Sequence, residues 1–161
     1  MVANDPKHMM IAKGKHSLSK IAIYALGVLA NRENLLEPLS ESLDCFGIAI
    51  QLLDDVRDWE EDYLKRRYSY VILQLLSCSH LDVVECEWPS LDEIKKVIAS
   101  SDILESALEQ SNSWLYKAIK AVNDMRCKYW IRYLENGVKT NKSIIEYSVR
   151  KKLTFLFEPL L

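Results

Sequence analysis

A dense cluster of acidic side chains follows directly on an apolar segment, and this junction most limits how the chain can fold. Six carboxylates occupy the nine residues 54–62, and Arg57 is the one basic residue among them. The preceding residues 46–50, Phe-Gly-Ile-Ala-Ile, are apolar. Spacings of three and four residues predict a helix with one acidic side and one apolar side. One side of this helix must therefore pack in a core, and the other must face solvent or cations.

The two predicted sides carry different kinds of residue. The acidic side comprises Gln51, Asp54, Asp55, Asp58 and Asp62. The apolar side comprises Ile48, Leu52, Val56, Trp59 and Tyr63. The acidic side has two interpretations, a solvated helix end or a site for divalent cations. Repulsion between like charges and the helix dipole both disfavour carboxylates at a helix C-terminus, so compensating cations are expected.

Oxygen ligands on a stiff helix are typical of a magnesium site. Mg²⁺ binds one or two carboxylates, keeps several waters and bridges to substrate phosphates. No His or Cys occurs within the acidic cluster, which favours such a hard cation. The predicted metal ligands are Asp54, Asp55, Asp58 and Asp62.

Residues 47–58, with the pattern Gly-x-x-x-Gln-x-x-Asp-Asp-x-x-Asp, resemble the second aspartate-rich motif of the trans-isoprenyl diphosphate synthases. Upstream, residues 15–17, Lys-His-Ser, and then Leu26-Gly27 follow the order of that family's lysine helix. The acidic stretch also resembles the second motif of the squalene and phytoene synthases. Both groups share one all-helical fold within the terpenoid synthase superfamily.

The resemblance implies an isoprenoid-synthase-like helical bundle that ionises an allylic prenyl diphosphate with Mg²⁺, as prenyltransferases and terpene synthases do. It implies that Lys15 contacts the substrate diphosphate and that Gln51 lies beside the substrate. Lys65 and Arg67, in the basic cluster just after the acids, are candidates for a clamp on the diphosphate oxygens. Simple charge balance with the acids is the other interpretation of that basic cluster.

Some features of the family are replaced or missing. Ile50 stands where the family usually has Phe, and His16 stands where it has Thr. The family's first aspartate-rich motif and its arginine pair do not precede Lys15. The resemblance covers residues 10–75 and corresponds to the second half of the fold. We therefore expect the isolated chain to be inactive and to need a second helical half or another copy of itself. The alternative is a non-catalytic helical subunit or regulatory partner of a prenyl synthase.

Helical periodicity elsewhere predicts an all-α chain of one helical domain, residues 1–161. Residues 1–14 are an unpatterned start, 15–76 hold the lysine helix and the motif helix, and 90–161 hold the C-terminal helices. Ser90 and Glu93 have the spacing of a capping box before a helix. The remaining helices are predicted at 17–30, 40–62, 63–76, 102–136 and 142–155, with Asn136-Gly137 as a C-terminal stop.

Composition excludes several classes of protein. The 21 basic and 23 acidic residues give no excess of positive charge for nucleic acid. The four cysteines lack a CxxC pair, so a reduced, cytoplasmic protein is expected, and Cys78, His80 and Cys86 form a poor zinc pattern. The absence of any Glu-x-x-His sequence argues against a ferritin-like di-iron bundle. No apolar run approaches the ~20 residues of a transmembrane segment.

Overall fold

The computed structural model describes residue 14 and residues 17–78 and 88–157. Every regular element in these ranges is helical, which confirms the all-α prediction. None of the helices described is long and apolar enough to cross a membrane. The elements in chain order are α2 (Ser17–Leu29), the 3₁₀ helix η2 (Glu33–Leu35), α3 (Leu36–Arg57), α4 (Trp59–Leu64), α5 (Tyr70–Cys78), α6 (Leu91–Ser100), α7 (Ile103–Ala121) and α8 (Lys128–Phe157).

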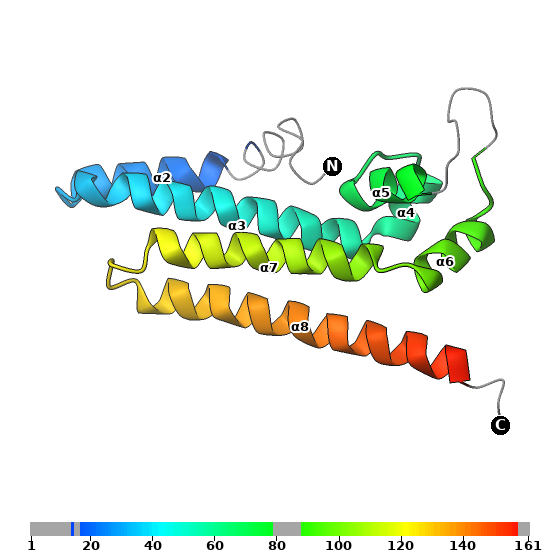
Figure 1. Ribbon diagram of the computed structural model, residues 1–161. Coiled ribbons are helices and arrows are strands. Elements are labelled where there is room, and N and C mark those ends of the chain that lie inside the picture. Colours follow the sequence, from blue (N-terminus) through cyan, green and yellow to red (C-terminus); the bar gives the residue numbers. More distant parts are fainter. Residues whose placement is uncertain (1–13, 15–16, 79–87, 158–161) are drawn as a thin grey trace.

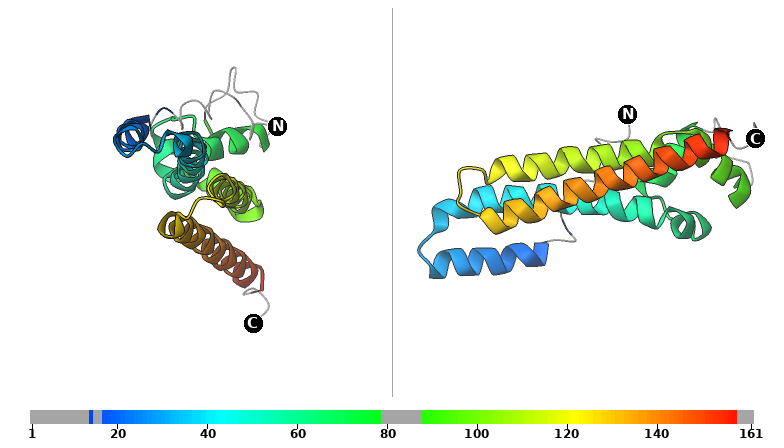
Figure 2. Two further views of the ribbon diagram at one scale, coloured as in Figure 1. Left: turned by 90° about the vertical axis from the view of Figure 1, so that its left-hand side faces the viewer. Right: turned by 90° about the horizontal axis from the view of Figure 1, so that it is seen from below.

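Four long helices lie side by side and alternate in direction, as Figure 1 shows. The end-on view in Figure 2 shows that α2, α3, α7 and α8 form a row, with α2 at one edge and α8 at the other. Helix α3 packs most extensively on α7, and α7 packs next on α8. The short helices α4, α5 and α6 gather at the end of the row where α3 ends (Figure 1). The acidic motif therefore lies where the long helices meet this group.

The apolar side of the motif helix packs in the larger of two hydrophobic clusters. Ile48, Leu52 and Tyr63 are buried there, while Val56 and Trp59 are partly buried against them. This confirms the predicted apolar side. The other buried members come from α5, α6 and α7: Tyr70, Val71, Ile72, Leu75, Ile94, Ile98, Ile103 and Ala107.

A smaller cluster and a set of buried hydrogen bonds join α3, α7 and α8. The cluster contains Cys45, Ala49, Leu115, Ala118, Leu134 and Val138. Ser42 Oγ donates to the Ala118 carbonyl at 2.8 Å, and Ser111 Oγ donates to the Ala49 carbonyl at 2.8 Å. Because both hydroxyls find acceptors on the facing helix, these polar residues are buried without an unsatisfied donor.

The sequence predicted some helix boundaries correctly. Helix α2 ends one residue before the predicted limit. At the start of α6, the Ser90 hydroxyl accepts from the Glu93 N–H, and the Glu93 carboxylate accepts from the Ser90 N–H at 2.8 Å. The predicted capping box is therefore confirmed.

The motif helix differs from its prediction at both ends. It begins at Leu36, and Pro38 lies within its first turn, where a missing N–H costs no helical hydrogen bond. It ends at Arg57, and α4 follows as a separate short helix. The hydrogen bond from Asp58 N–H to Asp54 O closes the end of α3, and the bond from Asp62 N–H to Asp58 O opens α4; both are 2.8 Å long. The i→i−4 hydrogen bonding is therefore interrupted at Asp58, where α4 starts as a new helix.

The predicted stop at Asn136-Gly137 is wrong. Helix α8 runs through these residues, and the chain instead turns between Ala121 and Lys128. A Cβ atom at position 137 would lie only 3.2 Å from Leu115 Cδ1. Gly137 thus permits close packing of α8 on α7, and the separate helix predicted at 142–155 is part of one longer helix.

Candidate acidic-motif site

Asp54 and Asp58 present exposed carboxylates at the C-terminal end of α3. Asp54 lies in the last turn, and Asp58 follows the helix as its C-terminal cap residue. Within the part of the chain that the structure describes, neither side chain makes a hydrogen bond or ion pair. Their spacing of four residues places them one helical turn apart. These two oxygen donors are therefore available to a cation or a partner.

Asp55 has a different environment from its neighbour in the motif. Its side chain is buried, with the residue only 3% exposed. Oδ1 accepts from the Gln51 side-chain amide at 2.6 Å, and Oδ2 accepts from the Tyr70 backbone N–H at 2.8 Å. Tyr70 is the first residue of α5, so its N–H has no acceptor within that helix. Asp55 thus joins the motif helix to the N-terminus of α5, where a negative charge is favourable.

Glu61 and Asp62 are balanced by the basic cluster that follows, and Glu60 pairs with Lys95 of α6. Lys65 forms an ion pair with Glu61. Arg67 Nη1 lies 3.7 Å from Glu61 and 3.6 Å from Asp62. The hydrogen bond from Lys65 lowers the pKa of the Glu61 carboxyl. These contacts are those expected from charge balance, and exposed pairs of this kind contribute little stability.

The structure brings some predicted site residues together and separates others. Among the described residues, no group of three or more His, Cys, Asp or Glu side chains is arranged to hold a metal ion. Asp54 and Asp58 form an exposed pair, whereas Asp55 faces α5 with Gln51. The predicted site residue Lys15 lies outside the described residues. Two members of the weak zinc pattern, His80 and Cys86, also lie outside them.

One buried polar network was not predicted from the sequence. Glu105 of α7 is only 7% exposed, and it accepts hydrogen bonds from Ser148 Oγ at 2.5 Å and Lys152 Nζ at 2.7 Å. Burial raises the pKa of Glu105, but the hydrogen bonds from Lys152 and Ser148 outweigh it, so the pKa is lowered overall. The sequence signal was a carboxylate at an apolar position of α7, and its partners are more than 40 residues away along the chain.

Comparisons with known proteins add no family assignment. No protein-family model matches the chain, and neither a curated protein nor a solved structure matches it. The resemblance of residues 47–58 to the isoprenoid synthases therefore stays a prediction.

Proposed function

We propose that this chain is the acidic-motif part of an isoprenoid-synthase-like helical protein. In this proposal, Asp54 and Asp58 bind Mg²⁺ together with the diphosphate of an allylic prenyl substrate. The observation that supports it is the exposed pair of carboxylates, one turn apart and without side-chain partners in the described part of the chain. Two carboxylates suit Mg²⁺, because it keeps waters and takes further oxygens from phosphate.

The proposed chemistry is heterolysis of the allylic carbon–oxygen bond, in which pyrophosphate leaves with the bonding electron pair. Bound Mg²⁺ would supply neutralisation of the charge that develops on the leaving group. Lys15 and Gln51 would contact the substrate. Asp55 would keep the motif helix fixed against α5. Lys65 and Arg67, which pair with Glu61 and Asp62, would add positive charge to this end of the motif.

The exposed apolar face of α2 supports the need for a second helical part. No residue of Ser17–Leu29 is buried, although the helix carries several large apolar side chains. Leu18 is 77% exposed and Leu29 is 81% exposed. Large uncovered apolar patches usually mark interaction sites. A second part with its own carboxylates would also complete a metal site for which Asp54 and Asp58 provide too few ligands, so we expect the chain alone to be inactive.

Calorimetric titration with Mg²⁺, in the presence and absence of farnesyl diphosphate, tests the metal role. We expect saturable Mg²⁺ binding only with the diphosphate present. The double variant Asp54→Asn/Asp58→Asn should lose it. Glu41→Gln is the matched control, because it removes an exposed carboxylate from the N-terminal part of the same helix, well away from Asp54 and Asp58. Tight binding of the metal alone, or full binding by the double variant, would count against the proposal.

A second candidate function is a non-catalytic helical subunit that packs on a prenyl synthase. The exposed face of α2 favours this candidate without reference to the acidic motif. The two candidates differ in one observable. A purely structural subunit would assemble with its partner equally well after Asp54→Asn/Asp58→Asn, and partner-dependent turnover would not change. Loss of turnover with intact assembly would instead favour the metal-binding role.

A further inference from the structure

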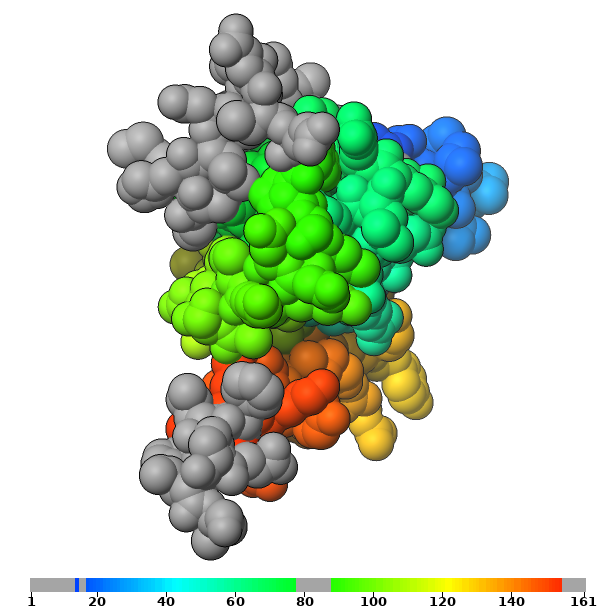
Figure 3. Space-filling view, turned by 90° about the vertical axis from the view of Figure 1, so that its right-hand side faces the viewer, coloured from blue at the N-terminus to red at the C-terminus, as the bar shows by residue number. Residues whose placement is uncertain are grey.

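A groove separate from the carboxylate pair lies where α8 meets α6 and the start of α7. Figure 3 shows the end of the molecule where these helices meet, with α6 above the C-terminal half of α8. The groove has a volume of about 690 Å³, which falls within the ~300–1,000 Å³ of small-molecule sites. It is therefore large enough for a ligand of modest size.

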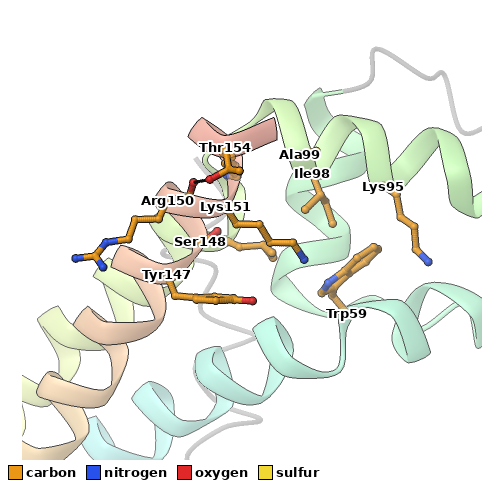
Figure 4. A pocket seen from close by; sticks show the side chains of 11 residues that line it. Trp59, Lys95, Ile98, Ala99, Tyr147, Ser148, Arg150, Lys151 and Thr154 are labelled. Carbon is orange, nitrogen blue, oxygen red and sulfur yellow. Dashed lines mark hydrogen bonds between the residues drawn. The ribbon is translucent and has the colours of Figure 1, made fainter. Parts of the chain in front are cut away.

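The walls of this groove are apolar and come from three sides. Ile98 and Trp59 lie on one side and Tyr147 of α8 lies on the other, as Figure 4 shows. Leu104 of α7 contributes further apolar surface. Tyr147 is 67% exposed, so one aromatic face is left for a ligand. These surfaces suit a hydrocarbon chain.

Positive charges surround the apolar walls. Lys95 is offset by Glu60, 3.4 Å away, and Lys152 is offset by the buried Glu105. Lys151 and Arg150 are both exposed and have no side-chain partner among the described residues. Figure 4 shows that Lys151 points toward Trp59 across the groove, whereas the Arg150 side chain points away from it. Lys151 therefore places an uncompensated positive charge beside the apolar surface.

The groove has a fixed base on the α8 side. Ser148 and Lys152 both bind the buried Glu105, and Lys152 also donates to the Ser101 carbonyl. These contacts hold α8 against α7 at the level of the groove. Arg150 and Lys151 lie between the two anchored residues in the chain, so their backbone positions are set by the same contacts.

We propose that this groove binds a single-chain amphiphilic anion, with its hydrocarbon tail between Trp59 and Tyr147 and its phosphate or carboxylate head at Lys151. The protein's own cations neutralise the head, so binding is independent of Mg²⁺. This site is distinct from Asp54 and Asp58, and the proposal stands whether or not those residues bind a metal.

Calorimetric titration of the chain with dodecyl phosphate and with laurate, in EDTA and below their micellar concentrations, tests this site. We expect one saturable site for both probes, and the tighter probe identifies the preferred head group. Lys151→Gln should weaken binding about tenfold, because a charge-assisted hydrogen bond is lost. Arg150→Gln should leave it nearly unchanged, because that side chain points away from the groove. Tyr147→Ser should weaken it by removing one wall. Lys139→Gln/Lys142→Gln is the matched control, since both lysines are exposed on α8 but do not line the groove.

Three results would overturn the proposal. Equal affinity for dodecyl maltoside would show an apolar surface without charge selection. Unchanged affinity in Lys151→Gln would show that this cation does not hold the head group. Absence of saturable binding, together with a solution mass twice that of the chain that falls on Tyr147→Ser, would show that a second copy covers the groove.

Discussion

The two flanks of α3 differ in how completely they are covered. On one flank, α7 packs closely, and buried hydroxyls of Ser42 and Ser111 form hydrogen bonds across the contact. On the other flank, α2 contributes no buried residue. The ion pair between Lys20 Nζ and Asp44 Oδ1, at 2.6 Å, joins α2 to α3 there. Both neighbouring helices have apolar stripes, so composition alone does not explain the difference.

The exposed apolar side chains of α2 make this flank the place where we expect a further contact. A helix gains most of its stability in a protein by burying an apolar face. Helix α2 exposes Leu18, Ile21, Leu26, Val28 and Leu29. A partly exposed ion pair contributes at most about 1 kcal/mol and does not replace that burial. We therefore expect α2 to be the part of the chain that is most sensitive to a partner.

The largest loss of stability is expected when a large side chain on the covered α7 side is replaced by alanine. Leu108 of α7 is 1% exposed, and Leu108→Ala should lower the free energy of unfolding by about 2–5 kcal/mol, because it leaves a cavity. Leu29→Ala on α2 should change it by less than about 0.5 kcal/mol in dilute solution. Urea denaturation of both variants measures the difference. A comparable loss of unfolding free energy in Leu29→Ala would contradict the difference between the two flanks, because it would mean that α2 is already covered.

The next largest loss of stability is expected at Asp55 and not at its neighbour Asp54. Asp55→Ala removes the acceptor for the Tyr70 N–H and the Gln51 amide, and it should cost about 1–3 kcal/mol. Asp54→Ala should be within about 0.5 kcal/mol of the unchanged protein, because Asp54 is exposed. Thermal denaturation of both variants provides the test. Equal destabilisation would contradict the assignment of Asp55 as the residue that anchors α5.

The sequence predicted features that depend on local patterns. The capping box of Ser90 and Glu93 and the apolar side of the motif helix follow from spacings within a few residues, and both are confirmed. The environment of Asp55 did not follow, since its acceptor role depends on Tyr70, whose N–H is placed by the bend after α4. Periodicity placed Asp54 and Asp55 on one acidic side but did not distinguish which of them would be buried.

The helix end predicted at Gly137 failed for a related reason. A glycine after asparagine is typical of a helix stop, but here it allows contact with Leu115 of another helix. The turn that actually ends α7 contains neither glycine nor proline, and Asn123 and Asp124 are its only local turn signal. The network around Glu105 was also beyond local pattern, because it joins residues of α7 and α8.

A smaller effect is expected at the cap of α6, which contributes to the covered cluster through Ile94 and Ile98. Ser90→Ala removes the acceptor for the Glu93 N–H and should cost about 1 kcal/mol. Ser90→Thr should restore most of it, because a threonine hydroxyl also caps. Chemical denaturation distinguishes them. If both variants lost the same stability, steric fit rather than capping would explain the role of Ser90.

The smallest effect concerns acid stability on the α8 side. The pKa of Glu105 is lowered in the folded chain, so its contribution is present above the ordinary value of 4.5 and is lost as pH falls through the lower, folded pKa. Glu105→Gln should remove that part of the pH dependence. Stability measured from neutral pH to pH 3 should therefore fall less steeply in the variant. Parallel curves would contradict a structural role for the ionised Glu105.

Sedimentation equilibrium tests most directly whether this chain is one part of a larger helical assembly. Because α2 exposes an apolar face, we expect the purified chain to associate with increasing concentration beyond its 18.7 kDa mass. Leu26→Lys/Leu29→Lys should return it to the single-chain mass without loss of helical circular dichroism, and Lys139→Gln/Lys142→Gln should leave association unchanged. A mass of 18.7 kDa at all concentrations, together with steady release of pyrophosphate from farnesyl diphosphate that is lost on Asp54→Ala, would contradict the account.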